Sequence, residues 1–188
     1  DHMGNVDVFS QQIYSLITIF TLIILFLSCL YATSQQEKLF SPLWLIFIGV
    51  MLDFGANAIA YFASNAYNAG ENISFYVFTE LSFSLFAMIF MVMAAMHFLI
   101  AGSTYVWVCI SLGILGLFAV GLFVYLFPDG DIINNMRQIF PMAGSVCLSI
   151  GLWSETSGRH KSGFTIFALL MSVMSFYMVL IFLKNLLP

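Results

Sequence analysis

The sequence has few charged residues. Asp, Glu, Lys and Arg make up 7% of its 188 residues, against 62% that are hydrophobic, and the mean hydropathy is +1.02. Soluble domains carry about 25% charged residues, so this composition excludes that class. The basic residues number 5, form no run and leave a net charge of −4, so nucleic acid is not an expected partner. The composition predicts an integral membrane protein.

Cysteine and catalytic signatures are also scarce. Cys29, Cys109 and Cys147 are far apart and form no Cys-x-x-Cys pair, so we interpret them as small buried hydrophobic residues. The chain contains no His-Glu-x-x-His pattern, no Gly-x-Ser-x-Gly pattern and no acid pair at helical spacing. We therefore predict that this chain is not an enzyme and needs neither a cofactor nor a metal.

Long apolar runs dominate instead. A helix needs about 20 apolar residues to cross a hydrocarbon core of about 30 Å. The runs are continuous rather than alternating, which argues against a membrane β-barrel. Short polar connections place consecutive runs antiparallel. We predict one all-α domain over 8–188, a six-helix up-and-down transmembrane bundle. Its expected spans are 8–33, 42–64, 75–101, 104–127, 132–153 and 164–183.

Small residues indicate which of these helices pack closely. In lipid, glycine, alanine and serine mark the places where helix backbones approach each other. The spans 42–64, 104–127 and 132–153 contain such residues, so we expect them to form a tight interior with 75–101. The first and last spans are expected to face lipid or a second copy of the chain.

The ends of the chain carry less information. Residues 1–7 are polar, and their opening Asp-His-Met-Gly looks like a remnant of an expression vector, so we leave them out of the functional argument. The Lys and Arg residues divide almost evenly between the two faces of the predicted bundle, so the positive-inside rule does not decide its orientation.

Acidic residues inside the apolar runs are the first candidate functional residues. A charged side chain at bilayer depth costs about 2.5 to 3.5 kcal/mol on insertion scales, so an intramembrane acid is by default a functional-site hypothesis. Asp53 and Glu80 are such acids on two neighbouring predicted helices. Asp53, Asn57 and Tyr61 repeat at a spacing of four residues, which places them on one helix face. Counted from the connection at 65–74, Glu80 lies about one turn from the level of Asn57.

The span 132–153 brings a base to a similar depth. Arg137 lies there beside Gln138, and Pro141 has no amide hydrogen to give to the carbonyl of residue 137. Three interpretations remain open: an internal ion pair of Arg137 with Glu80 or Asp53 that locks the bundle, a pocket for a ligand or ion, or a contact with lipid headgroups or water. The candidate ligand-binding residues are Asp53, Asn57, Tyr61, Glu80, Arg137 and Gln138.

A second group of residues offers soft metal ligands. Met93, Met96 and His97 share one face of the span 75–101, and thioethers with an imidazole are suitable ligands for Cu(I). The simpler interpretation is that the methionines fill gaps and that His97 reaches the membrane interface. We predict no metal site here.

The stretch 136–183 carries a resemblance. It combines Arg137 near a helix start, Gly144, Gly151, Trp153, a short basic turn at 159–161 and a final apolar helix. In this respect it resembles the membrane-embedded sensory modules that precede diguanylate cyclase or histidine kinase domains in bacteria. The resemblance implies a dimeric input domain whose last helix passes a signal to an output domain.

These observations lead to one functional prediction and two alternatives. We expect a multi-pass sensory or receptor module of a bacterial inner membrane that binds a small or lipid-like ligand within the bundle and signals to an output domain beyond this chain. The alternatives are a small proton- or cation-coupled transporter or channel, and a scaffold subunit without catalytic activity. The expected partners are membrane lipid, the ligand and a second copy of the chain.

Overall fold

The structure of the chain is a computed structural model. It describes residues 42–100, 104–127, 131–156 and 161–187, together with Leu16, Ile19, Phe20, Ile23, Phe26 and Leu27. All regular structure in these residues is helical, which confirms the predicted all-α class. The helices are α2 (Pro42–Asn68), α3 (Ser74–Leu99), α4 (Thr104–Leu126), α5 (Asp131–Thr156) and α6 (Lys161–Leu186).

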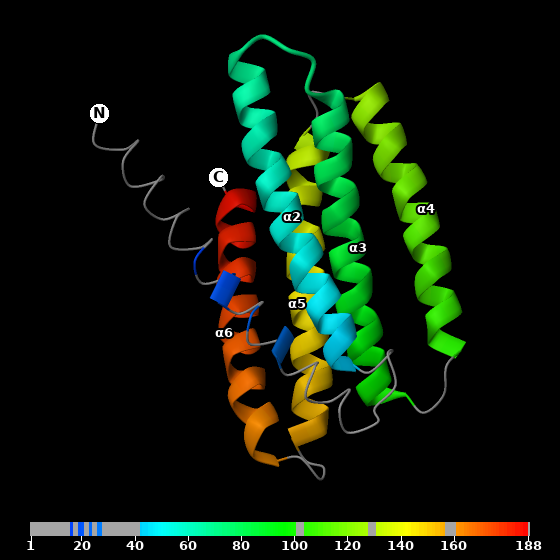
Figure 1. The fold of residues 1–188 in the computed structure, drawn as a ribbon, viewed down its shortest axis with the longest axis vertical. Helices are drawn as coiled ribbons and strands as arrows, with labels where there is room; N and C mark the ends of the chain where they lie inside the picture. The colour runs from blue at the N-terminus through cyan, green and yellow to red at the C-terminus, as the bar shows by residue number, and fades with distance from the viewer. Residues whose placement is uncertain are drawn as a thin grey trace, which may run out of the picture.

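Consecutive helices run in opposite directions, as Figure 1 shows. α3 packs against α2, α4 and α5, and α6 packs against α5. In Figure 1, α4 forms one edge of the bundle and α6 lies toward the other. Because the directions alternate, α3 and α5 both begin at the end of the bundle where α2 finishes.

Among the described residues, four helical segments are long and apolar enough to cross a membrane. They are α2, α3, α4 and the Ala168–Leu186 part of α6, so the fold is compatible with a membrane protein. The predicted count of six spans is not supported. The predicted span 8–33 lies largely outside the described residues. α5 is not among the four segments. Its first two turns hold charged and amide side chains, which lower its hydropathy.

The connection between α2 and α3 is shorter than predicted. α2 continues beyond the predicted end of its span, and the turn then uses Gly70, whose φ of +75° lies in the left-handed region that glycine adopts without strain. The amide of Glu71 donates to the carbonyl of Ala66 at 3.0 Å, a helix-ending bond that such a glycine permits. Asn72 Oδ1 accepts from the amide of Ser74 at 2.9 Å and so supports the start of α3. The predicted span ended where the apolar run ends, at residue 64, whereas α2 continues through polar residues to Asn68.

Small residues set the contacts of α3, as expected. A Cβ on Gly151 would lie 2.7 Å from Ala95 Cα, and one on Gly144 would lie 3.1 Å from Met88 Cα. A Cβ on Gly49 of α2 would lie 3.2 Å from Met91 Cγ. At Gly151 the backbone of α3 lies too close for a Cβ, and at Gly144 and Gly49 a Cβ would fit only tightly. The prediction that α2 and α5 pack tightly against α3 is therefore confirmed.

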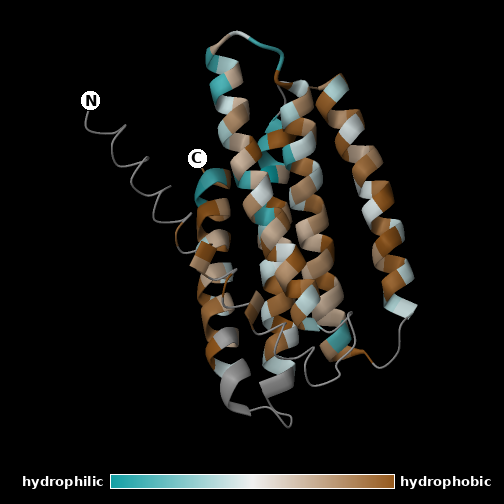
Figure 2. Ribbon diagram, in the orientation of Figure 1, coloured by the Kyte–Doolittle hydropathy of each residue, from teal (hydrophilic) through white to brown (hydrophobic). Residues whose placement is uncertain are grey.

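The outer helices are mostly exposed and apolar. Residues of α6 fit the prediction, since 11% of its most apolar stretch is buried. α4 does not, because only 17% of its most apolar stretch is buried although it was expected in the interior. Its glycines lie against α3, and of the other described helices only α5 meets it, at a small contact. In Figure 2, α4 and the coloured part of α6 consist mostly of hydrophobic residues.

Candidate functional site

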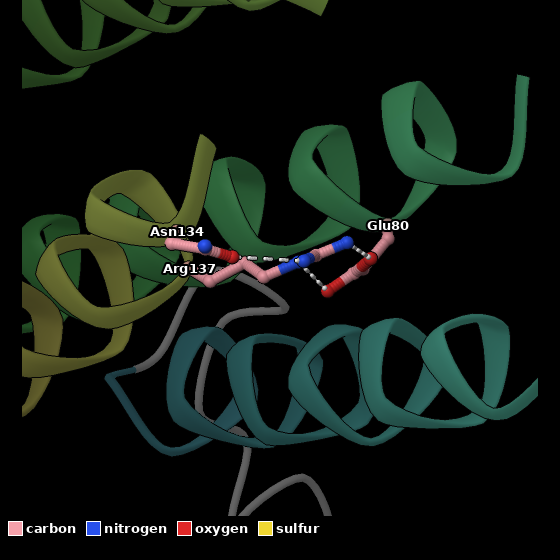
Figure 3. Close-up of polar contacts among 3 residues, drawn as sticks. All are labelled: Glu80, Asn134 and Arg137. Carbon is pink, nitrogen blue, oxygen red and sulfur yellow. Dashed lines mark hydrogen bonds and ion pairs between the residues drawn. The ribbon is translucent and has the colours of Figure 1, made fainter. Parts of the chain in front are cut away.

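A salt bridge joins α3 to α5 near the end of the bundle where both helices begin. Glu80 lies in the second turn of α3 and Arg137 in the second turn of α5. Arg137 Nε donates to Glu80 Oε1 at 2.9 Å, and Arg137 Nη2 donates to Glu80 Oε2 at 3.0 Å (Figure 3). Two parallel bonds of this kind are the strongest arrangement of a guanidinium with a carboxylate. The sequence left Glu80 and Asp53 as candidate partners of Arg137, and the structure shows the ion pair with Glu80.

The two partners differ in their access to solvent or lipid. The side chain of Glu80 is 9% exposed, whereas that of Arg137 is 36% exposed. The carboxylate is therefore enclosed by the bundle and depends on Arg137 for its charge balance. The guanidinium has a face that remains accessible.

Asn134 is a third member of the site that the sequence reasoning missed. Its Oδ1 accepts from Arg137 Nη1 at 3.2 Å, and Figure 3 shows it on α5 beside the pair. The signal was present, since Asn134 precedes Arg137 by one turn and so shares its helix face. A guanidinium has five N–H donors, so the three bonds described leave two N–H groups for another acceptor.

Gln138 contributes an acceptor without a donor. Its Oε1 is buried and has no hydrogen-bond partner among the described residues. A buried carbonyl oxygen left without a donor costs about 1 to 3 kcal/mol, so such groups are rare and call for an explanation. One turn separates Gln138 from Asn134, which places the two amides on the same side of α5.

The three candidates on α2 lie in different surroundings. The amide of Asn57 is exposed and donates to the carbonyl of Asp53 within the same helix at 2.9 Å. Tyr61 is 60% exposed, and its ring packs edge-on against Phe62. Asp53 is partly buried and takes part in an interaction of its own. The bonds of the salt bridge therefore come from α3 and α5, with no hydrogen bond from Asn57.

The possible soft-metal residues do not share one environment. His97 is exposed, and its Nδ1 lies 3.0 Å from the hydroxyl of Tyr105 at the start of α4. Met93 is buried inside the bundle. In the described ranges, His, Cys, Asp and Glu form no group of three that could hold a metal ion.

A row of hydroxyl groups links α5 to α6. We call Ser145, Ser149, Ser172 and Ser175 the serine seam. Ser149 Oγ and Ser175 Oγ lie 3.0 Å apart, and Trp153 Nε1 donates to Ser172 Oγ at 2.6 Å. Three of the four serines are buried. The sequence reasoning treated Ser145 and Ser149 only as small residues, and their spacing gave no means of finding the partner on α6.

Comparison with known proteins adds no relative. No protein-family model matches the chain, and no curated protein and no solved structure matches it at a significant level.

Proposed function

We propose that the chain is a membrane-embedded receptor module that binds a small or lipid-like ligand beside Glu80 and Arg137 and transmits the binding through α6. In this proposal the membrane is a bacterial inner membrane, the chain crosses it several times, and the signal passes to an output domain or partner. The same function is what the resemblance of 136–183 to bacterial sensory modules, noted in the sequence, implies.

One observation carries the proposal. The carboxylate of the salt bridge lies inside the bundle, yet Arg137 keeps an accessible face and two N–H groups for which the described residues supply no acceptor. A pair that served only to lock α3 to α5 would gain from satisfying these donors within the fold. The partly satisfied guanidinium is instead suited to accept a further ligand atom.

α5 supplies the route from the site to α6. It carries Arg137 on its contact with α3 and half of the serine seam on its contact with α6. Suppose that the bundle has two arrangements that differ in the position of α5. A ligand that binds one arrangement more tightly raises the population of that arrangement, and only the difference between the two affinities drives this shift. The bonds of the serine seam would then move α6 with α5.

The test is native mass spectrometry of the detergent-purified protein, which detects a copurified small molecule and the mass of a dimer. The critical variant combines Glu80→Leu with Arg137→Met, because replacing both partners with apolar residues keeps a bundle folded while removing the polar site. The matched control is Asn135→Ala, an exposed amide of the same helix. We expect the bound molecule in the wild type and the control and its loss from the double variant.

Two other outcomes would support the alternative functions. Proton or cation flux into liposomes that stops in Glu80→Gln, with no bound molecule, would replace the receptor with a transporter. The buried carboxylate beside a base is the observation that favours this alternative. If the protein neither retains a ligand nor transports ions, the remaining hypothesis is that it is a scaffold subunit.

A further inference from the structure

We propose that this site takes the phosphate of an anionic phospholipid headgroup, held between the second turn of α5 and the last turn of α6. The inference rests on the proposed receptor function and specifies its ligand class. Three observations carry it: the donors left at Arg137 and Asn134, the level of Lys184 on α6, and the acidic residues at the aqueous end of the bundle.

The accessible part of the site offers hydrogen-bond donors. Arg137 has two N–H groups, and Nδ2 of Asn134 has two more, for which the described residues supply no acceptor. Asn134 Oδ1 and both oxygens of Glu80 already accept bonds from Arg137. A hydroxyl group would bring one more donor to this cluster, whereas the oxygens of a phosphate diester only accept. The unused groups therefore favour an anion, and phosphate is an acceptor that guanidinium groups bind strongly.

An anion can bind here without breaking the salt bridge. The bonds to Glu80 use one N–H of Nε and one of Nη2, so the remaining N–H groups lie on Nη1 and Nη2. The side chain of Arg137 is more exposed than that of Glu80, so the positive partner of the pair is the one that a ligand reaches. The enclosed carboxylate keeps its counter-charge while the guanidinium binds a second group.

A second basic residue lies at the same level on α6. α5 and α6 run antiparallel, and Ser145 Oγ contacts Met178 Sδ. Arg137 precedes Ser145 by eight residues, and eight residues beyond Met178 comes Leu186, in the same turn of α6 as Lys184. Lys184 is exposed. Figure 2 shows polar residues both at the start of α5 and at the end of α6.

The charges at this level leave room for one negative group. The salt bridge is neutral as a pair, so the charge of Lys184 remains. Asp53 does not balance it at this level. Gly55 packs against Phe83, which lies deeper in α3 than Glu80, and Asp53 lies deeper still in α2. A phosphate diester carries one negative charge, which matches that of Lys184.

The surroundings favour a lipid over a free phosphate. Glu71 and Asp131 are exposed at the aqueous end of the bundle. Arg137 lies six residues beyond Asp131, about 9 Å along α5, so a soluble anion would have to pass these carboxylates. Exposed apolar residues such as Ile139 and Leu183 lie on the sides of α5 and α6. A headgroup can enter from this side, with its acyl chains against the apolar surface.

The experiment compares lipids with the same acyl chains. Phosphatidylglycerol, phosphatidylcholine and galactosyl diacylglycerol are added to the detergent-purified full chain, and native mass spectrometry measures the bound fraction of each. Equilibrium dialysis measures the binding of glycerophosphoglycerol, which is the headgroup of phosphatidylglycerol without its acyl chains. The four probes separate the anionic phosphate from a zwitterionic headgroup, from an uncharged headgroup and from a soluble anion.

Two variants and one control locate the phosphate. Lys184→Gln removes a charge from an exposed side chain. Asn134→Asp keeps the acceptor for Arg137 but replaces the Nδ2 donors with a negatively charged oxygen. Asn135→Asp is the matched control, because it adds the same charge to the neighbouring exposed amide of α5.

We expect phosphatidylglycerol to bind more tightly than the other three probes. Lys184→Gln should weaken its binding about fivefold, the effect of one basic residue near an anionic headgroup. Asn134→Asp should weaken it about tenfold or more, the effect of one hydrogen bond to a charged group, and its thermal unfolding temperature should not fall. Asn135→Asp should change the binding much less than Asn134→Asp.

Several results would overturn the inference. Preference for galactosyl diacylglycerol, or equal binding of phosphatidylcholine, would exclude an anionic headgroup. Equally tight binding of glycerophosphoglycerol would identify a soluble anion instead of a lipid. Equal losses in the two aspartate variants would place the phosphate elsewhere on the bundle.

Two further outcomes separate this inference from the receptor function. A copurified molecule without phosphate that is lost from the variant combining Glu80→Leu with Arg137→Met would exclude the phospholipid but keep the receptor. A wild-type protein that binds no probe and retains no molecule would overturn both.

Discussion

The two faces of α5 hold their neighbours by different chemistry. Toward α3, the helix combines close backbone contact at Gly144 and Gly151 with the charged bonds of Arg137. Toward α6, it uses hydroxyl bonds such as that between Ser149 and Ser175. Close packing and a paired charge resist displacement, whereas single neutral bonds in a membrane contribute about 0.6 kcal/mol on average. The comparison indicates that α5 is held more strongly to α3 than to α6.

The largest effect should come from breaking the salt bridge on the α3 side. Arg137→Ala leaves the enclosed carboxylate of Glu80 without a partner, so we expect a loss of about 3 kcal/mol, the lower end of the range for broken buried pairs. Glu80→Ala leaves a guanidinium that is 36% exposed and can reach water or headgroups, so its loss should be nearer about 1 kcal/mol. Unfolding of both variants in detergent by a denaturant series measures the difference.

A control separates the salt bridge from packing. The combined variant Glu80→Leu with Arg137→Met should unfold within about 1 kcal/mol of the wild type, because apolar residues replace both charges. Equal losses in the two alanine variants would show that the carboxylate and the guanidinium are equally enclosed, contrary to the exposures described.

An intermediate effect should follow from crowding the close contact of α5 with α3. In Gly151→Ala the new Cβ would lie 2.7 Å from the backbone of Ala95, so the helices must separate, at a cost of about 1 to 3 kcal/mol. Gly113→Ala is the matched control, since its nearest side-chain atom lies at an ordinary 3.6 Å. Thermal unfolding followed by circular dichroism compares the two. A tolerated Gly151→Ala would mean that α5 shifts freely against α3.

The smallest effect should come from the α6 side. A double-mutant cycle of Ser149→Ala and Ser175→Ala should give a coupling of about 0.6 kcal/mol and no more than about 1.7 kcal/mol. Unfolding free energies of the wild type, both single variants and the double variant supply the four corners of the cycle. A coupling as large as that of the salt bridge would remove the distinction between a strongly held face and a weakly held face of α5.

The sequence predicted the helical class and much of the α2–α3 hairpin, because both depend on local properties. Runs of apolar residues specify where α2 and α3 lie, and small residues such as Gly144 specify where backbones approach. Pairing of Glu80 with Arg137 was one of several possible outcomes, since Asp53 was an equal candidate at the sequence level. The exposed position of α4 could not be predicted, because its glycines mark a contact on one side only.

Composition and periodicity alone determined that this chain forms long apolar helices, because a backbone in a nonpolar environment satisfies its hydrogen bonds within each helix. Tertiary structure decided how each helix is rotated about its axis. That rotation turns Arg137 toward Glu80, buries Gln138 Oε1 where no described residue donates to it, and aligns Ser149 with Ser175. The physical reason is that rotation depends on side chains from several helices packing at once, a condition that no single segment of the sequence contains.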